Sequence, residues 1–169
     1  MELKEAMYNR RSVRKYTTEP VSDADLDLLL HYAMSGPSAC NRKPWEFYVV
    51  RSETVKDELR RVGRFTNRAA PVILVIAGDI ERALPAPISD YWVQDCSAAV
   101  ENILLGAVSI GLGTCWCGIH PDAAYVEKVQ GILGLEKHVV PLGLIHLGHP
   151  DEFPESRDQY DASFIHYLD

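Results

Sequence analysis

The sequence lacks the features that mark several common functional classes. No uninterrupted apolar run approaches the length of about 18 residues that a membrane-spanning helix needs. The N-terminus also lacks the basic stretch followed by an apolar stretch that marks a secretion signal. The chain is also short of positive charge, with 17 Lys and Arg against 24 Asp and Glu and a formal net charge of −7. Nucleic acid and anionic membranes are therefore excluded as main partners. We expect a cytoplasmic protein.

Cysteine is scarce as well. Cys115 and Cys117 form one close pair, Cys40 and Cys96 stand alone, and no histidine lies at ligand spacing from them, so no metal site is predicted. A redox dithiol would need two residues between its cysteines. The chain also shows no Ser/His/Asp set, no paired catalytic carboxylates and no phosphate-binding glycine spacing. We expect reduced thiols that serve as small apolar residues.

The 169 residues, 47% of them hydrophobic, predict one domain over 1–169 with a substantial core. Apolar spacing predicts helices over 2–9, 22–36, 52–63, 90–110 and 121–134. Strands are predicted over 45–50, 72–77, 114–119 and 139–147, with a loop over 79–89 that is a candidate mobile cover for a site. The expected helix boundaries are Ser22, Ser52 and Pro121 at the starts and Gly36, Gly63 and Gly134 at the ends.

The helix expected over 90–110 is apolar on most of its circumference. Such a helix must be buried all round, and one chain of this length cannot easily cover every side. The segment 151–169 is polar at first and ends in an apolar stretch that can anchor on another surface. The sequence therefore predicts a homodimer.

A short basic run, 10–14, stands out in this acidic chain. If it is extended, Arg10, Ser12 and Arg14 share one face and Arg11 lies on the other. Guanidinium groups with a hydroxyl between them can donate to a phosphate and to a second, flatter anionic group. The alternative is a solvated strand end that forms ion pairs with the many carboxylates.

Two loops could add to such a site. Short polar side chains in 37–41 suit hydrogen bonds to the edges of a flat ligand, although they could equally form a capped turn. Glycines in 111–118 allow a ligand to approach backbone N–H groups, although they could simply end a helix before a buried strand.

The order and spacing of 9–16, 36–47, 95–107, 111–116 and 147–150 resemble those of the FMN-dependent nitroreductase family, and the match extends from residue 2 to about 166. The resemblance implies an α+β fold with a central mixed, mostly antiparallel sheet flanked by helices. It also implies an intertwined homodimer with FMN at the interface, in which 151–169 reaches to the partner subunit.

The resemblance also implies roles for single residues. Arg10 and Ser12 would hold the FMN phosphate with Arg11 close by, and Arg157 would be a second phosphate-binding arginine. Arg14 would lie near N1 and O2 of the flavin, where a fixed cation favours reduction. The remaining contacts would be Pro37, Ser38 and Asn41 from the partner subunit and the backbone of Cys115, Trp116, Cys117 and Gly118 facing flavin N5.

Two positions depart from the family pattern. Glu155 stands where a basic residue is frequent, and Lys43 replaces a common glutamine. The implied function is hydride transfer from NADH or NADPH through flavin N5 to a nitroaromatic, quinone or similar acceptor, with no protein acid or base. Alternatives are dehalogenation or oxidative flavin chemistry on a specific metabolite, a non-catalytic module that stores FMN, and a dimeric scaffold without cofactor.

Overall fold

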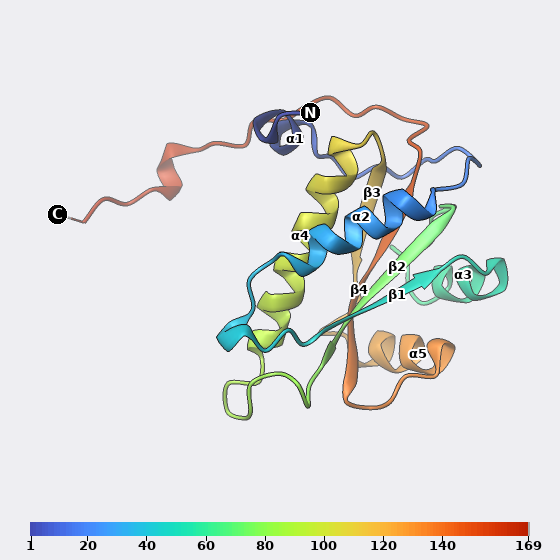
Figure 1. The fold of residues 1–169 in the computed structure, drawn as a ribbon, viewed down its shortest axis with the longest axis vertical. Helices are drawn as coiled ribbons and strands as arrows, with labels where there is room; N and C mark the ends of the chain where they lie inside the picture. The colour runs from blue at the N-terminus through green and yellow to red at the C-terminus, as the bar shows by residue number, and fades with distance from the viewer. Residues whose placement is uncertain (169) are drawn as a thin grey trace.

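A computed structural model describes residues 1–168, which form a four-stranded sheet with helices on both faces (Figure 1). The strands are β1 (Trp45–Val50), β2 (Val72–Asp79), β3 (Gly113–Gly118) and β4 (Val139–Gly148). The helices are α1 (Leu3–Asn9), α2 (Asp23–Met34), α3 (Glu53–Arg60), α4 (Tyr91–Ser109) and α5 (Ala123–Leu133), with two 3-10 turns, η1 (Ala39–Asn41) and η2 (Ala162–Phe164).

The sheet order is β1-β2-β4-β3, and neighbouring strands run antiparallel. The expected α+β class is confirmed. All three strand pairs are antiparallel, so the sheet is not mixed as expected; within residues 1–168 a parallel contact occurs only as an isolated bridge between Ser12, outside the named strands, and Thr114. This bridge matters because it fastens the segment after α1 to the outer edge of β3.

The two faces of the sheet form two hydrophobic cores. Side chains alternate along β2, so Leu74 and Ile76 face α2 and α4 while Ile73 and Val75 face α3 and α5. All four are fully buried, which confirms the prediction that the continuous apolar run of this strand is covered on both faces.

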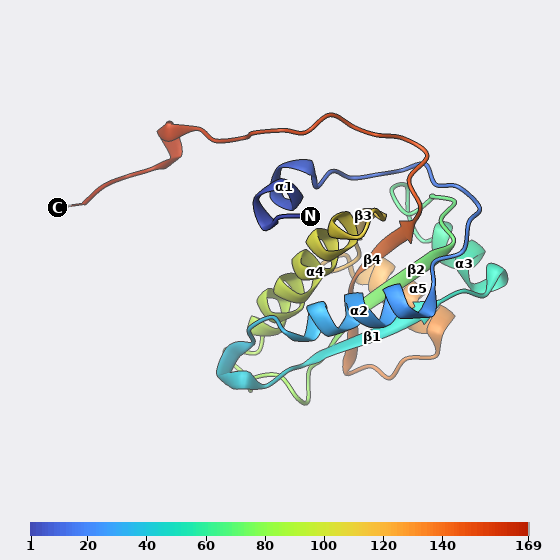
Figure 2. The ribbon, with the colours of Figure 1, turned by 45° about the horizontal axis from the view of Figure 1, so that its top comes forward.

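Helix α4 is not covered on every side within one chain. Its residues Ala99, Val100 and Ile103 are completely buried, but Leu105 and Val108 remain partly exposed. This agrees with the expectation that one chain cannot easily cover this helix on every side, because the sheet and α2 cover only part of the circumference of α4 (Figure 2). Among residues 1–168, no helix is both long and apolar enough to cross a membrane.

Helix boundaries match the expected capping residues only in part. The Ser22 hydroxyl caps α2, and Gly134 ends α5 in the left-handed conformation at φ 64°. Ser52 makes no side-chain capping bond, and α5 starts after an Asp122 cap rather than at the preceding proline. Gly36 is not left-handed; a Cβ there would lie 3.3 Å from the Asn102 amide nitrogen, so the close approach of α4 favours glycine.

Gly78 in β2 provides a prediction about the core that lies between the sheet and helices α2 and α4. A Cβ at Gly78 would overlap the buried Trp92 ring, whereas one at Gly131, in the exposed part of α5, would meet nothing within 4 Å. We expect Gly78→Ala to lower the free energy of unfolding by about 1–3 kcal/mol through overpacking. The matched Gly131→Ala should raise it by up to about 1 kcal/mol through helix propensity. Urea denaturation of both variants checks this, and equal effects would contradict the packing argument.

Candidate functional site

The basic run lies along the edge of β3. The Val13 backbone N–H donates to the Thr114 carbonyl at 2.8 Å, next to the Ser12–Thr114 bridge. Val13 is buried against Gly113, where a Cβ would lie 2.9 Å from its side chain. With Val13 anchored inward, the polar residues of the run are free to form a site.

Four arginines meet in one cavity of about 400 Å³. Its lining residues are Met7, Arg10, Arg11, Ser12, Arg14, Arg157 and Gln159. Within residues 1–168, the one carboxylate in ion-pair distance of these arginines is Glu101, whose Oε1 is 3.9 Å from Arg10 Nε. Ion pairing therefore does not account for the cluster, and the cavity has the charge and donors of an anion site.

Arg157 reaches this cavity because residues 149–157, here named the C-terminal strap, run antiparallel to 8–17 (Figure 2). Successive contacts join Thr17 N to His149 O (2.9 Å), Asp151 N to Lys15 O (2.9 Å), Arg14 N to Glu152 Oε1 (2.6 Å), the Arg11 guanidinium to Glu155 O, and Arg157 N to Tyr8 O (3.3 Å). Glu155 contributes its carbonyl, and its side chain does not line the cavity.

The free edge of β3 continues from the basic run. Thr114 directs its carbonyl away from β4 toward Val13. Because peptide groups alternate along an antiparallel strand, Trp116 and Gly118 direct theirs to the same free edge, while Cys115 and Cys117 bond to β4. Trp116 and Gly118 are also exposed. Of the glycine-rich segment, these two amides are the ones placed to meet an acceptor atom of a ligand.

The thiols of β3 point into the core beside α3 and α5. The Cys117 Sγ lies 3.0 Å from the Phe65 carbonyl and 3.8 Å from His146 Nδ1. The neighbouring Cys117 thiol, helped by the charge of Arg14, lowers the pKa of the Cys115 thiol, whereas the neighbouring Cys115 thiol and burial raise the pKa of Cys117.

His146 is completely buried in the same core, and burial lowers its pKa to about 4. The imidazole is therefore neutral near pH 7. Its Nε2 has no hydrogen-bond partner among the described residues. His146 belongs to β4, where it is the register partner of Cys115, so it is not part of the free edge of β3 where Trp116 and Gly118 are exposed.

The polar loop 37–41 does not line the arginine cavity. It lies at the opposite end of α4 from α1 (Figures 1 and 2), where the Asp95 carboxylate accepts from the Ala39 N–H at 2.8 Å. Cys40, Asn41 and Lys43 all have positive φ, of 48°, 55° and 50°. Such strained backbone is uncommon outside functional sites. One chain therefore brings Arg10, Arg11, Ser12, Arg14 and Arg157 together and keeps Pro37, Ser38 and Asn41 apart from them.

Three residues near the site cannot be recognised as functional from their residue type alone. Gln159 lines the cavity, Glu152 contacts the backbone of Arg14, and Asp95 is buried beneath the strained loop. Each gains its place through a contact between distant segments of the chain. Asp95 had the best available signal, as one of two acidic residues, with Glu101, within an apolar helical stretch.

Comparison with known proteins gives a consistent result. The profile described as "Nitroreductase family" matches residues 7–64 and 60–149. A protein of Methanothermobacter thermautotrophicus, named as an NADH dehydrogenase/NAD(P)H nitroreductase, is 39% identical over 98% of this chain and 86% of its own. A crystal structure under the same name from Parabacteroides distasonis has TM-score 0.91 and 34% identity, covering 98% of this chain and 96% of that one.

A second similar structure was solved with FMN bound. A nitroreductase from Desulfovibrio desulfuricans, solved in complex with FMN, has TM-score 0.84 and 28% identity, covering 100% of this chain and 98% of that one. Profile, sequence and structure agree over nearly the full length, and on this basis the chain belongs to the nitroreductase family.

Proposed function

We propose that this chain is an FMN-dependent NAD(P)H oxidoreductase that reduces a nitroaromatic, quinone or similar acceptor. The observation that carries the proposal is the cavity in which Arg10, Ser12 and Arg157 converge with a single neighbouring carboxylate. Relatives named as an FMN reductase and an NADPH-flavin oxidoreductase support the cofactor and the electron donor.

The residues of the cavity fit the two ends of FMN. A phosphate dianion matches the guanidinium groups of Arg10 and Arg157 with the Ser12 hydroxyl between them. Arg14 lies two residues beyond Ser12 on the same extended segment, roughly 6–7 Å along it, toward the ring end of such a ligand. The phosphate would therefore be held at one end of the cavity and the flavin ring at the other.

The ring end offers donors and charge but no acid or base. When bound, FMN supplies hydride transfer at its N5. The N–H groups of Trp116 and Gly118 at the free edge of β3 would orient that atom, and Arg14 would favour negative charge at N1 and O2. The protein's contribution is position and electrostatics.

One spectrum tests the cofactor, and an anaerobic titration tests the activity. We expect the purified protein to bind FMN and quench its fluorescence, and NADH or NADPH to bleach the flavin absorption. A nitroaromatic or quinone should then restore the absorption. Failure to bind FMN refutes the proposal, whereas binding without bleaching by either nicotinamide supports a storage module instead.

We also propose that the protein acts as a homodimer in the cytoplasm, with each site completed by the partner's 37–41 loop. That loop is held by Asp95 in a strained form and has no role in the arginine cavity of its own chain. All four cysteines are free, which agrees with a reducing compartment. The remaining exposed face of α4 is where a partner subunit would pack.

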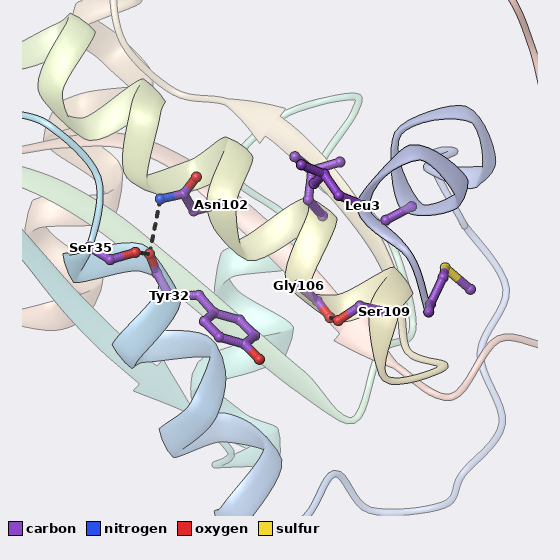
Figure 3. Close-up of a pocket in the computed structure, with 9 residues that line it drawn as sticks. Leu3, Tyr32, Ser35, Asn102, Gly106 and Ser109 are labelled. Carbon is purple, nitrogen blue, oxygen red and sulfur yellow. Dashed lines mark hydrogen bonds between the residues drawn. The ribbon is translucent and has the colours of Figure 1, made fainter.

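The last residues of the chain support the same assembly. Beyond the strap they extend away from the body (Figures 1 and 2), and Phe164, Tyr167 and Leu168 are 80%, 84% and 95% exposed. A groove of about 310 Å³ between α1, α2 and α4 is lined by apolar and small side chains (Figure 3). Its walls include Leu3, the Tyr32 ring and Gly106. We propose that the partner's apolar tail packs on this side of the molecule.

Removing residues 160–169 tests the assembly and leaves Arg157 and Gln159 in place. We expect the truncated chain to shift toward the monomer in light scattering and to bind FMN more weakly, because the exposed apolar anchors are lost. Phe65→Ser, which alters a 64% exposed aromatic in the loop between α3 and β2, is the control and should leave the mass unchanged. A monomeric intact chain, or a truncated chain that stays dimeric, would refute this role of the tail.

A further inference from the structure

We propose that Glu152 is a positioning residue for the cofactor site, because its carboxylate holds Arg14 and the C-terminal strap in register. The inference rests on the proposed function for its ligand. The contact itself is independent of any ligand: Glu152 Oε1 accepts a hydrogen bond from the Arg14 backbone N–H at 2.6 Å. A bond to an ionised acceptor is among the stronger hydrogen bonds in proteins.

The carboxylate of Glu152 is bonded to the backbone and not to a guanidinium group. Within the described chain, no arginine side chain lies within ion-pair distance of Glu152, although four arginines line the adjacent cavity. A carboxylate that served to neutralise the cluster would pair with one of them. Glu152 instead leaves their charge available to a ligand and fixes the chain that carries them.

Arg14 is held at two points as a result. Glu152 fixes its backbone N–H, and its Nη1 lies 3.3 Å from the Ser12 carbonyl. The guanidinium itself is exposed and makes no ion pair within residues 1–168. Its position therefore depends on where the backbone is held. Backbone bonds hold the residues on either side, Val13 to the Thr114 carbonyl and Lys15 to the Asp151 N–H, and Glu152 is the side chain that bonds to Arg14 itself.

Arg157 depends on the same contact. The strap has no helix or strand between Asp151 and Arg157, so a few bonds determine its path. On the C-terminal side of Glu152, two hydrogen bonds hold the strap. The Arg11 guanidinium donates to the Glu155 carbonyl, and the Arg157 N–H donates to the Tyr8 carbonyl at 3.3 Å. Glu152 is the side chain of the strap that bonds to the basic run, and it joins the phosphate end to the ring end of the site.

Three variants separate positioning from charge. Glu152→Ala removes the bond and the charge, Glu152→Gln keeps an acceptor oxygen without the charge, and Asp151→Ala removes a neighbouring charge whose side chain makes no bond among the described residues. We expect Glu152→Ala to raise the Kd for FMN about tenfold, as loss of one charge-assisted bond implies. Glu152→Gln and Asp151→Ala should stay within about threefold of the intact protein.

Hydrogen exchange of the Arg14 amide in cofactor-free protein is the second readout. Exchange should be faster in Glu152→Ala and close to the intact protein in Glu152→Gln. A Glu152→Gln variant that behaves like Glu152→Ala, or an Asp151→Ala variant that does, would overturn the proposal. If the intact protein binds no FMN, the proposed function fails, but the exchange of the Arg14 amide still decides the role of Glu152.

Discussion

FMN should be lost almost completely when Arg10 and Arg157 are both replaced by alanine. Each guanidinium is placed to make a charge-assisted bond to phosphate, worth about 1.5–3 kcal/mol or roughly 10–100-fold in Kd. If the two effects add, the double variant should bind roughly 10²–10⁴-fold more weakly. Fluorescence titration with FMN measures this directly.

The two single variants should differ. Arg10 Nε lies 3.9 Å from Glu101 Oε1, so Arg10→Ala leaves that carboxylate without its cationic partner near the phosphate and adds repulsion to the lost bond. Within residues 1–168, Arg157 has no carboxylate at ion-pair distance, so Arg157→Ala should weaken binding less. Arg51→Ala, which removes an exposed arginine paired with Asp23 outside the cavity, is the control and should bind FMN normally. Equal binding by Arg51→Ala and the double variant would refute the phosphate assignment.

Arg14→Ala should slow the chemistry while the cofactor stays bound. In the proposed site Arg14 lies at the ring end of the cavity, and its exposed guanidinium makes no ion pair among the described residues. Removing a fixed donor from the place where charge develops typically costs about 10²–10³-fold in rate. We therefore expect flavin reduction by NADH or NADPH, followed anaerobically by stopped flow, to slow by about that factor, with less than a tenfold change in Kd.

Arg14→Lys separates charge from geometry. Lysine keeps the positive charge but lacks the planar fork of the guanidinium, so part of the lost rate should return. The flavin reduction potential should follow the same order, highest in the intact protein and lowest in Arg14→Ala. A rate unchanged in Arg14→Ala, or an effect confined to Kd, would show that Arg14 belongs to the phosphate end.

Much of the fold is predictable because the signals are local. The apolar run 72–77 indicates a strand buried on both faces, and β1 matches its predicted range, Trp45–Val50. The basic run is equally local: a period of two in the sequence becomes a row of donors once the segment is extended. The other segments that resemble the nitroreductase family indicated, from the sequence alone, that the ligand is a flavin.

The remainder depends on distant parts of the chain. No spacing in the sequence places the Glu152 carboxylate on the Arg14 amide or Asp95 on Ala39, since 138 and 56 residues separate these pairs. The exposed side of α4 was expected, but what covers it was not determined by the sequence. An apolar circumference does not tell whether the same chain or another covers it. The placement of 37–41 against a flavin stays a prediction.

The open edge of β3 has a further consequence for the handling of the protein. Ser12 and Val13 close one half of this edge, and Trp116 and Gly118 leave the other half with unpaired amides. An uncovered strand edge is a template for pairing with another chain, and natural sheets keep such edges short or protected. A ligand bound at this edge would cover the unpaired amides of Trp116 and Gly118. We therefore expect FMN supplied during overproduction to lower aggregation of the protein.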